Sequence, residues 1–372
     1  MRRLRAVFVT LAVLAALAWL GVRARYGGGD DFPDRSGAPE LGADALEVVA
    51  NLDFPPASVA VSAKGRVFAS FHPEADPPLA VFELLNGAPQ AYPPGGLPGG
   101  LTYQTVRGLH VDARNRLWVL DYGRFGVGTA RLLAFDLATD ALVHRHDFPR
   151  KIALLGSSLA DLAVAPDGRR VYVADASLFL QVPGIVDYDP GHQSSRRLLQ
   201  GHESVLPEAF VPVVQGVRME LYGVFAVRPG VDAIALDDAG DWLYFAPATS
   251  RWLYRAHRKD LDDASLARAP LESRVEKYAE KTMSDGIALD REGTVYLADM
   301  EHSAIVAIGP DRKLRTLVKD ERLRWPEGLA FAPDGWLYVT CSALHQVLGK
   351  GPEEVAAHRP YQIFRFKPRG GS

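Results

Sequence analysis

The sequence contains a single cysteine, Cys341, among 372 residues. One cysteine excludes an intramolecular disulfide, so the stability of the fold has to come from side-chain packing. Because Cys341 follows a strand-like pattern, we expect a small buried hydrophobic residue rather than a nucleophile. Methionine is also scarce, with four residues, whereas the chain has 34 glycines and 26 prolines. This composition favours a turn-rich, all-β protein.

Signature motifs of several enzyme classes are absent. The sequence has no Gly-x-Ser-x-Gly elbow, no His-Glu-x-x-His motif, no phosphate-binding loop and no dinucleotide-binding glycine pattern. Basic clusters are missing from the body of the chain. Residues 1–26 contain five arginines and no acid, and removing these five charges from the net charge of −3 leaves −8 for the remainder. We therefore expect no nucleic-acid partner.

The longest apolar run lies at the N-terminus, over residues 6–22. Arginines precede it, and Arg23, Arg25 and Tyr26 follow it. Its length lies between that of a signal-peptide core and that of a membrane-spanning helix. No small-x-small cleavage site precedes the polar stop, and no cysteine offers a lipidation site. We predict an exported, periplasmic or extracellular protein whose residues 1–26 are a signal peptide or, as we favour, an uncleaved membrane anchor.

A unit of two predicted strands recurs six times. Its clearest copy, 284–299, has an alternating apolar run, a glycine turn and a second alternating run, as in a β-hairpin. Other copies lie at 57–70, 107–121, 160–175, 232–246 and 326–340. The first apolar residues of the copies are Val59, Leu109, Leu162, Ile234, Ile287 and Leu329.

The spacing between these six markers ranges from 42 to 72 residues, which leaves room for two further strands in each copy. This period is typical of a propeller with four-stranded blades. We predict an all-β fold, a six-bladed β-propeller over 46–372, preceded by an N-terminal hydrophobic helix and by a flexible linker at 27–45. Single strands at 46–54 and 361–366 are expected to complete a blade shared by the two ends of the domain. Extra material at about 177–231 is either the mouth of a site or a decorative loop.

The repeats make some positions geometrically equivalent. Because innermost strands surround the channel of a propeller, Asp232, Asp285 and Glu327 are expected to converge at one channel mouth. Asp161 lies nearby, offset by one residue, and Arg107 lies across the ring. The equivalent residues, two positions before each marker, are Ala57, Arg107, Ala160, Asp232, Asp285 and Glu327.

Three interpretations of these carboxylates stay open. They could hold a divalent cation such as calcium, bind a cationic organic ligand such as an amine, or accept backbone N–H groups at strand starts. We therefore treat Asp161, Asp232, Asp285 and Glu327 as candidate ligand-binding residues, and the last three also as candidate metal ligands. Clustered carboxylates raise the pKa of at least one of them unless a cation compensates.

His110 breaks the repeat at another position of the innermost strand. A packed, hydrogen-bonded histidine and a catalytic one both stay open. His110 and Arg107 are the candidate catalytic residues, the first for proton transfer and the second for binding an anionic or carbonyl oxygen. In the other five copies the equivalent residue is alanine, at Ala60, Ala163, Ala235, Ala288 and Ala330.

Several stretches, in order over about residues 47–366, resemble the Yellow/major royal jelly protein family. The most specific are Arg-Leu-Trp-Val-Leu-Asp at 116–121 and Ser-Asp-Gly-Ile-Ala at 284–288. The resemblance implies an exported six-bladed propeller. Some members of that family bind biogenic amines in the central channel, and others are linked to dopachrome conversion. The cysteines common in animal members are missing, as expected of a bacterial-type member.

A more distant resemblance is to the gluconolactonase/regucalcin group of calcium-dependent lactonases, which are also six-bladed. Asp232 and Asp285 match positions of that group's metal ligands, whereas its first-blade glutamate is replaced by the Ala57-Ser58 neighbourhood. We expect a small-molecule ligand, a cationic amine or an aromatic metabolite, at the channel. The alternatives are a metal-dependent lactonase-type hydrolase, in which the metal polarises a carbonyl and activates water, and an interaction scaffold without catalysis.

Overall fold

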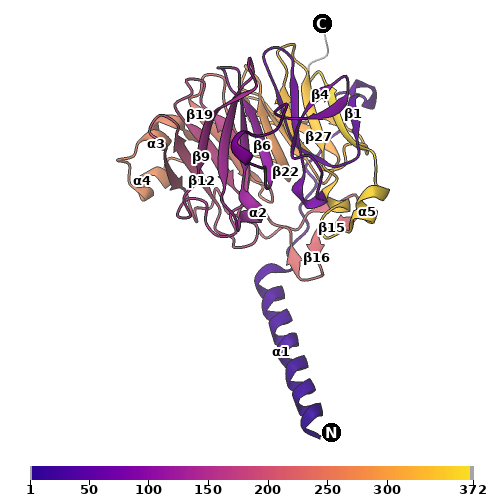
Figure 1. The fold of residues 1–372 in the computed structure, drawn as a ribbon. Helices are drawn as coiled ribbons and strands as arrows, with labels where there is room; N and C mark the ends of the chain where they lie inside the picture. Colours follow the sequence, from indigo (N-terminus) through magenta and orange to yellow (C-terminus); the bar gives the residue numbers. More distant parts are fainter. Residues whose placement is uncertain (1, 369–372) are drawn as a thin grey trace.

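The computed structural model of the chain describes residues 2–368. Its main strands form six four-stranded antiparallel sheets, which are the blades of a propeller (Figure 1). This confirms the predicted six-bladed β-propeller with an N-terminal apolar helix. Blade one contains β2 (Pro56–Val61), β3 (Val67–Phe71), β4 (Val81–Leu85) and β5 (Ala88–Ala91). Blade two contains β6 (Val106–Val111), β7 (Arg116–Asp121), β8 (Arg131–Asp136) and β9 (Ala141–Asp147). Blade three contains β10 (Leu159–Val164), β11 (Val171–Asp175), β12 (Gly184–Asp189) and β13 (Ser194–Leu198).

The second half of the ring repeats this order, with the innermost strand first in each of the blades. Blade four contains β18 (Val231–Leu236), β19 (Trp242–Pro247), β20 (Trp252–His257) and β21 (Glu276–Glu280). Blade five contains β22 (Ser284–Leu289), β23 (Val295–Asp299), β24 (Ala304–Ile308) and β25 (Leu314–Lys319). Blade six contains β26 (Pro326–Phe331), β27 (Leu337–Cys341), β28 (Tyr361–Phe366) and β1 (Glu47–Leu52).

Blade six closes the ring with strands from both ends of the domain. Strand β1 is antiparallel to β28, in a register that runs from Glu47 opposite Arg365 to Leu52 opposite Tyr361. The two terminal strands predicted from the sequence therefore lie side by side in one blade. Closure pairs sheet edges that would otherwise be exposed.

The innermost strands share an irregular register near their starts. In β22 and β26 the shift falls between Ser284 and Ile287 and between Pro326 and Leu329. Such bulges re-aim side chains, and they direct the acidic residues of these strands toward the channel. The glycine that follows each of these acids is required for a different reason. A Cβ on Gly286 would lie 1.7 Å from the carbonyl oxygen of Glu327. Glycine allows neighbouring innermost strands to approach this closely.

The hydrophobic core lies between adjacent blades. Phe68 of blade one packs with Leu117 and Phe135 of blade two, and all three are fully buried. Each blade covers the sheet face of its neighbour, as a ring of small repeats requires. Cys341 is 1% exposed and packs with apolar side chains of blade six, so the expected buried role is confirmed. Burial raises the pKa of its thiol.

Helix α1 (Arg2–Tyr26) projects away from the propeller (Figure 1). Its segment Val7–Tyr26 is long and apolar enough to cross a membrane, and none of it is buried. Residues 27–45, for which the sequence predicts a linker, run along the propeller. There Asp30 N donates to the carbonyl oxygen of Ala209 at 2.8 Å, and Phe32 is 8% exposed.

The insertion after blade three is smaller than the sequence suggests, because 184–198 supply β12 and β13 of that blade. The remainder includes two short hairpins, β14 (Val213–Val214) with β15 (Val217–Arg218) and β16 (Glu220–Leu221) with β17 (Phe225–Ala226). The innermost strands begin on the side of the propeller that carries α1 and these hairpins (Figure 1). We call this side the helix face. The opposite side, where the innermost strands end, is the open face. The other helices are α2 (Gly123–Gly126), α3 (Arg258–Asp262), α4 (Arg268–Glu272) and α5 (Pro352–Ala357).

Candidate functional site

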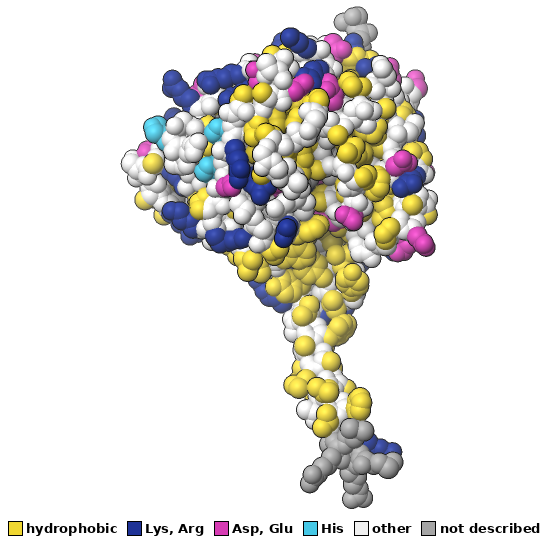
Figure 2. Space-filling model, viewed as in Figure 1, with side chains coloured by type: hydrophobic (Ala, Val, Ile, Leu, Met, Phe, Trp, Pro, Cys, Tyr) yellow, Lys and Arg dark blue, Asp and Glu magenta, His cyan; other side chains and the backbone are white. Residues whose placement is uncertain are grey.

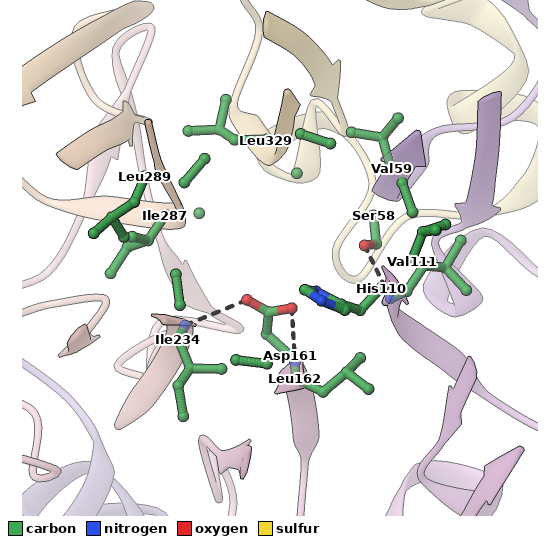
Figure 3. A pocket seen from close by; sticks show the side chains of 18 of the residues that line it. Ser58, Val59, His110, Val111, Asp161, Leu162, Ile234, Ile287, Leu289 and Leu329 are labelled. Carbon is green, nitrogen blue, oxygen red and sulfur yellow. Dashed lines mark hydrogen bonds between the residues drawn. The ribbon is translucent and has the colours of Figure 1, made fainter. Parts of the chain in front are cut away.

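The innermost strands enclose a central cavity of about 370 Å³. Its walls are mainly aliphatic because the alternating apolar residues of these strands point inward. Figure 3 shows the His110 ring and the Asp161 carboxylate pointing into this cavity. All six repeat markers line it, namely Val59, Leu109, Leu162, Ile234, Ile287 and Leu329.

The cavity opens at the open face. Among its lining residues, Asp285 and Glu327 lie at the starts of their strands and are each 7% exposed. Leu289 and Phe331, at the ends of the same strands, are half-buried, and Pro166, just beyond β10, is exposed. The apolar end of the channel is therefore its mouth. The carboxylates lie at the closed end, whereas the sequence led us to expect them at a mouth.

Loops of the helix face close the other end of the channel. His72 and Tyr122 follow the second strands of blades one and two, and Trp325 directly precedes β26. These three side chains are at most 4% exposed. They belong to connections outside the repeated hairpin, which is why the repeat pattern does not indicate this cover.

Arg107 is the positive centre of the closed end. Its Nη2 lies 3.1 Å from Oε1 of Glu327, and its Nη1 lies 3.8 Å from Oδ1 of Asp232. Burial alone lowers the pKa of Arg107, but the charges of Asp232 and Glu327 outweigh it and hold this pKa well above its usual value. Arg107 of blade two, which the sequence placed across the ring, thus forms an ion-pair cluster with Asp232 of blade four and Glu327 of blade six.

The carboxyl groups of the cluster are only partly compensated by the positive charge of Arg107 and by hydrogen bonds. Burial raises the pKa of Asp161 to about 7, although Asp161 accepts the backbone N–H groups of Leu162 at 2.8 Å and Ile234 at 3.3 Å. Burial and the charge of Glu327 raise the pKa of Asp285 to about 6. Burial also raises the pKa of Asp232 well above its usual value. Near neutral pH the cluster therefore carries fewer negative charges than carboxyl groups.

The candidate metal ligands do not fit a calcium ion. The Arg107 guanidinium lies against two of the three carboxylates, and Oδ2 of the third, Asp285, accepts a hydrogen bond from Trp325 Nε1 at 2.6 Å. Within residues 2–368, no group of three or more His, Cys, Asp or Glu side chains is arranged to hold a metal ion. The guanidinium and the indole already engage one oxygen of each carboxylate, and the positive charge of Arg107 opposes a second cation at the cluster.

His110 presents a free imidazole to the cavity. Its ring nitrogens form no hydrogen bond to any residue that the structure describes (Figure 3). Burial lowers its pKa to about 4, so the ring is neutral near pH 7. A neutral imidazole can donate from one nitrogen and accept at the other. The geometry thus favours a ligand-facing histidine over a hydrogen-bonded core histidine.

Sequence reasoning missed three residues around the cluster. His72 Nδ1 pairs with Glu74, and His72 Nε2 lies 3.8 Å from Oε1 of Glu327. Burial lowers the pKa of His72, but the charges of Glu74 and Glu327 outweigh it, and the net shift is upward. Trp325 is the third, and its place one residue before the Pro-Glu-Gly repeat is the signal that could have identified it. His72 and Glu74 carry no comparable signal, since they follow a strand in a loop of variable length.

Solved structures with the same fold include a gluconolactonase from Xanthomonas campestris, at 13% identity with a TM-score of 0.54, covering 87% of this chain and 88% of that one. The calcium-binding protein regucalcin from Agrobacterium tumefaciens is similar at 14% identity with a TM-score of 0.55, covering 89% of this chain and 95% of that one. At this level of identity the likeness shows the fold alone.

Sequence comparison gives the family. Major royal jelly protein 3 of Apis mellifera is 26% identical over 218 residues, which are 56% of this chain and 38% of that protein. Major royal jelly protein 7 of the same organism is 25% identical over 208 residues, 53% of this chain and 45% of that protein. The chain thus spans less than half the length of these relatives. The family model for major royal jelly proteins matches residues 104–357, and the chain therefore belongs to the major royal jelly protein family.

Proposed function

We propose that this protein is an exported, membrane-tethered propeller that binds a small cationic amine with an aromatic or other apolar body in its central channel. One observation carries the proposal. The cavity combines apolar walls with four lining carboxyl groups, those of Asp161, Asp232, Asp285 and Glu327, of which the second and the last contact the guanidinium of Arg107.

The distribution of charge favours a cationic ligand over an anionic one. The guanidinium of Arg107 is already in contact with Asp232 and Glu327, so an anion would have to displace a carboxyl group to reach it. Asp161 makes only backbone hydrogen bonds and points into the cavity (Figure 3). An ammonium group beside it would favour its ionised form and lower its pKa.

The cavity suits a small ligand in size and in surface. A volume of about 370 Å³ lies within the range of small-molecule sites, which combine apolar walls with a few polar groups that fix orientation. The neutral imidazole of His110 supplies a donor and an acceptor to such a ligand. The apolar helix α1 supports the proposed export and tethering.

Lactone hydrolysis is the second candidate, and His110 favours it. A neutral imidazole that no described residue engages has a free nitrogen that can accept a proton from a bound water, with the weak basicity that burial gives it. The calcium-dependent form of this reaction has no support in the donor set, because Arg107 lies among the carboxylates. We therefore derive no step through a metal ion.

The test compares three ligands of one shape by isothermal titration calorimetry on the full chain in detergent. Phenethylamine is cationic, phenethyl alcohol is neutral and 3-phenylpropionate is anionic. Saturable binding of the amine, with at least tenfold weaker binding of the other two, supports the proposal. Turnover of a lactone without amine binding would move the assignment to the hydrolase. If the protein neither binds the amine nor turns over a lactone, the interaction scaffold is the remaining assignment.

A further inference from the structure

Exposed apolar side chains surround the base of α1 on the helix face (Figure 2). They come from the loops of blades two and three and from the β16–β17 hairpin. Each is at least 44% exposed, and a patch of this kind on a soluble surface indicates an interaction site. We call this set the apolar rim; its members are Phe125, Val127, Leu155, Phe179, Leu180 and Tyr222.

The rim is continuous with the end of α1. The ring of Tyr26, the last residue of the helix, stacks on Phe225 with centroids 5.5 Å apart, and Phe225 lies 5.6 Å from Phe179. The neighbouring Leu180 packs directly against Gly156, which follows Leu155. The side chains in this series of contacts are all aromatic or aliphatic, and they connect the end of the helix to the surface of the propeller.

The outer part of the rim is held in a defined shape. Gly156 N donates to the carbonyl oxygen of Gly126 at 3.0 Å, which joins the loop of Leu155 to that of Phe125 and Val127. Arg150 donates to the carbonyl oxygens of Gly126, Val127 and Gly128 at 2.8–3.0 Å. The exposure of these apolar groups therefore does not come from a loose loop.

Helix α1 ends directly against the propeller. Gly28 N donates to Oε1 of Glu220 at 3.1 Å, and Arg228 Nη2 donates to the carbonyl oxygen of Tyr26 at 3.3 Å. The apolar segment Val7–Tyr26 has 20 residues, or about 30 Å of helix, which is about the thickness of the hydrocarbon core of a bilayer. When α1 spans a bilayer, Tyr26 lies at the lipid–water boundary, and the part of the rim that Phe225 joins to it, at Phe179, lies beside that boundary.

The charges beside the rim favour a lipid surface. Arg25, Arg124 and Lys151 are exposed around it, where they can contact lipid phosphates and anionic headgroups. The exposed acids Glu353 and Glu354 belong to α5 of blade six, on the other side of the ring. Asp31, exposed just after α1, forms an ion pair with Arg218. Aromatic residues flanked by cations are typical of the membrane interface.

We propose that the apolar rim inserts into the headgroup region of the bilayer that α1 spans, so that the helix face of the propeller is docked on the membrane. The open face and the mouth of the cavity then point away from the lipid, toward water-soluble ligands. This inference rests on the tethering part of the proposed function and is independent of the ligand.

The test places the full chain in phosphatidylcholine nanodiscs with 20–30% phosphatidylglycerol, an amount of the order that gives an anionic surface. An environment-sensitive fluorophore is attached in turn to Leu180→Cys and Leu85→Cys; the native Cys341 is buried. Leu85 is the matched control, since it is 50% exposed against 47% for Leu180 but lies at a turn of the open face. The quencher is a phosphatidylcholine brominated on its acyl chains.

Docking predicts that brominated lipid reduces the fluorescence at position 180 by about half and leaves position 85 unchanged. Equal fluorescence changes at both positions, or none at position 180, would overturn the docking of the rim while α1 remains an anchor. A chain that does not co-elute with the nanodiscs would overturn tethering and docking together. A Tyr222→Cys variant repeats the measurement on a separate hairpin. Phenethylamine titration in detergent reports on the channel alone, so its failure is distinguishable from these outcomes.

Discussion

Arg107 of blade two reaches past blade one to Glu327 of blade six, where its Nη2 lies 3.1 Å from Oε1. Both side chains are largely buried, at 12% and 9% exposed. A buried ion pair of this kind contributes little net stability when intact, but removing one partner leaves an uncompensated charge. The pair therefore fixes the charge balance at the closed end of the channel.

Arg107→Met is expected to destabilise the fold by about 3–5 kcal/mol, because Asp232 and Glu327 lose their counter-ion. The loss should be larger at pH 8 than at pH 5, since protonation relieves the repulsion among the carboxyl groups. Urea unfolding at the two pH values measures it. Arg291→Met, at an exposed position, is the control and should stay within about 0.5 kcal/mol of the unchanged protein. A loss no larger than that of the control would contradict the role of Arg107.

Asp161→Asn is expected to change how stability depends on pH. Burial raises the pKa of Asp161 to about 7 in the folded state, above its value in the unfolded chain. The folded state therefore binds more protons between these values, and its free energy of unfolding falls as the pH rises from about 4 to 7.

Asparagine removes this contribution, so Asp161→Asn should gain stability relative to the unchanged protein between pH 5 and pH 8, by about 1–4 kcal/mol. Urea unfolding at both pH values checks the sign. Asp334→Asn, exposed in the turn after β26, should follow the unchanged protein. Parallel pH curves for all three proteins would show that Asp161 is not buried in its neutral form.

His110→Ala introduces the residue that the other five blades have at this position. Because the imidazole has no hydrogen-bond partner among the described residues, the free energy of unfolding should change by less than about 1 kcal/mol. Affinity for the amine should fall, because the ligand loses a polar contact. A change in stability above about 2 kcal/mol with unchanged affinity would assign His110 to the core. The NMR resonances of this ring should titrate near pH 4, as burial requires.

Calcium is expected not to bind stoichiometrically at the cluster. The guanidinium of Arg107 lies among the carboxylates, and a divalent cation would have to displace it. Calorimetric titration of calcium into the full chain should give no more heat than titration into the Asp285→Ala, Glu327→Ala double variant. Stoichiometric binding that the double variant loses would restore the lactonase-type mechanism.

The regular part of the fold could be predicted because the repeat is visible in the sequence. Alternating apolar residues such as Ile287 and Leu329 pair with the second strands of their hairpins, Ile287 with Leu297 and Leu329 with Val339. The equivalence of these positions also led to the cluster, since Asp232, Glu327 and Arg107 do lie together.

The cover of the cluster could not be predicted. His72 and Trp325 lie in connections whose length and conformation differ from blade to blade, so no repeat relates them. The sequence also does not indicate which end of the channel is closed. Strand periodicity fixes which side chains point inward, but the packing of loops against one end is a tertiary effect. His110 was visible as an exception to an alanine pattern, whereas its lack of a hydrogen-bond partner needed coordinates.

The pH dependence of amine binding tests the central claim most directly. Phenethylamine stays protonated between pH 5.5 and pH 8, whereas Asp161 and Asp285 ionise over this range. Calorimetry on the full chain should therefore show about tenfold tighter binding at pH 8, equivalent to about 1.4 kcal/mol, and Asp334→Asn should behave in the same way. In Asp161→Asn, binding at pH 8 should be about tenfold weaker, and the smaller pH dependence that remains should come from Asp285. Affinity that does not change with pH, or that Asp161→Asn leaves intact, would contradict an ammonium site in the channel.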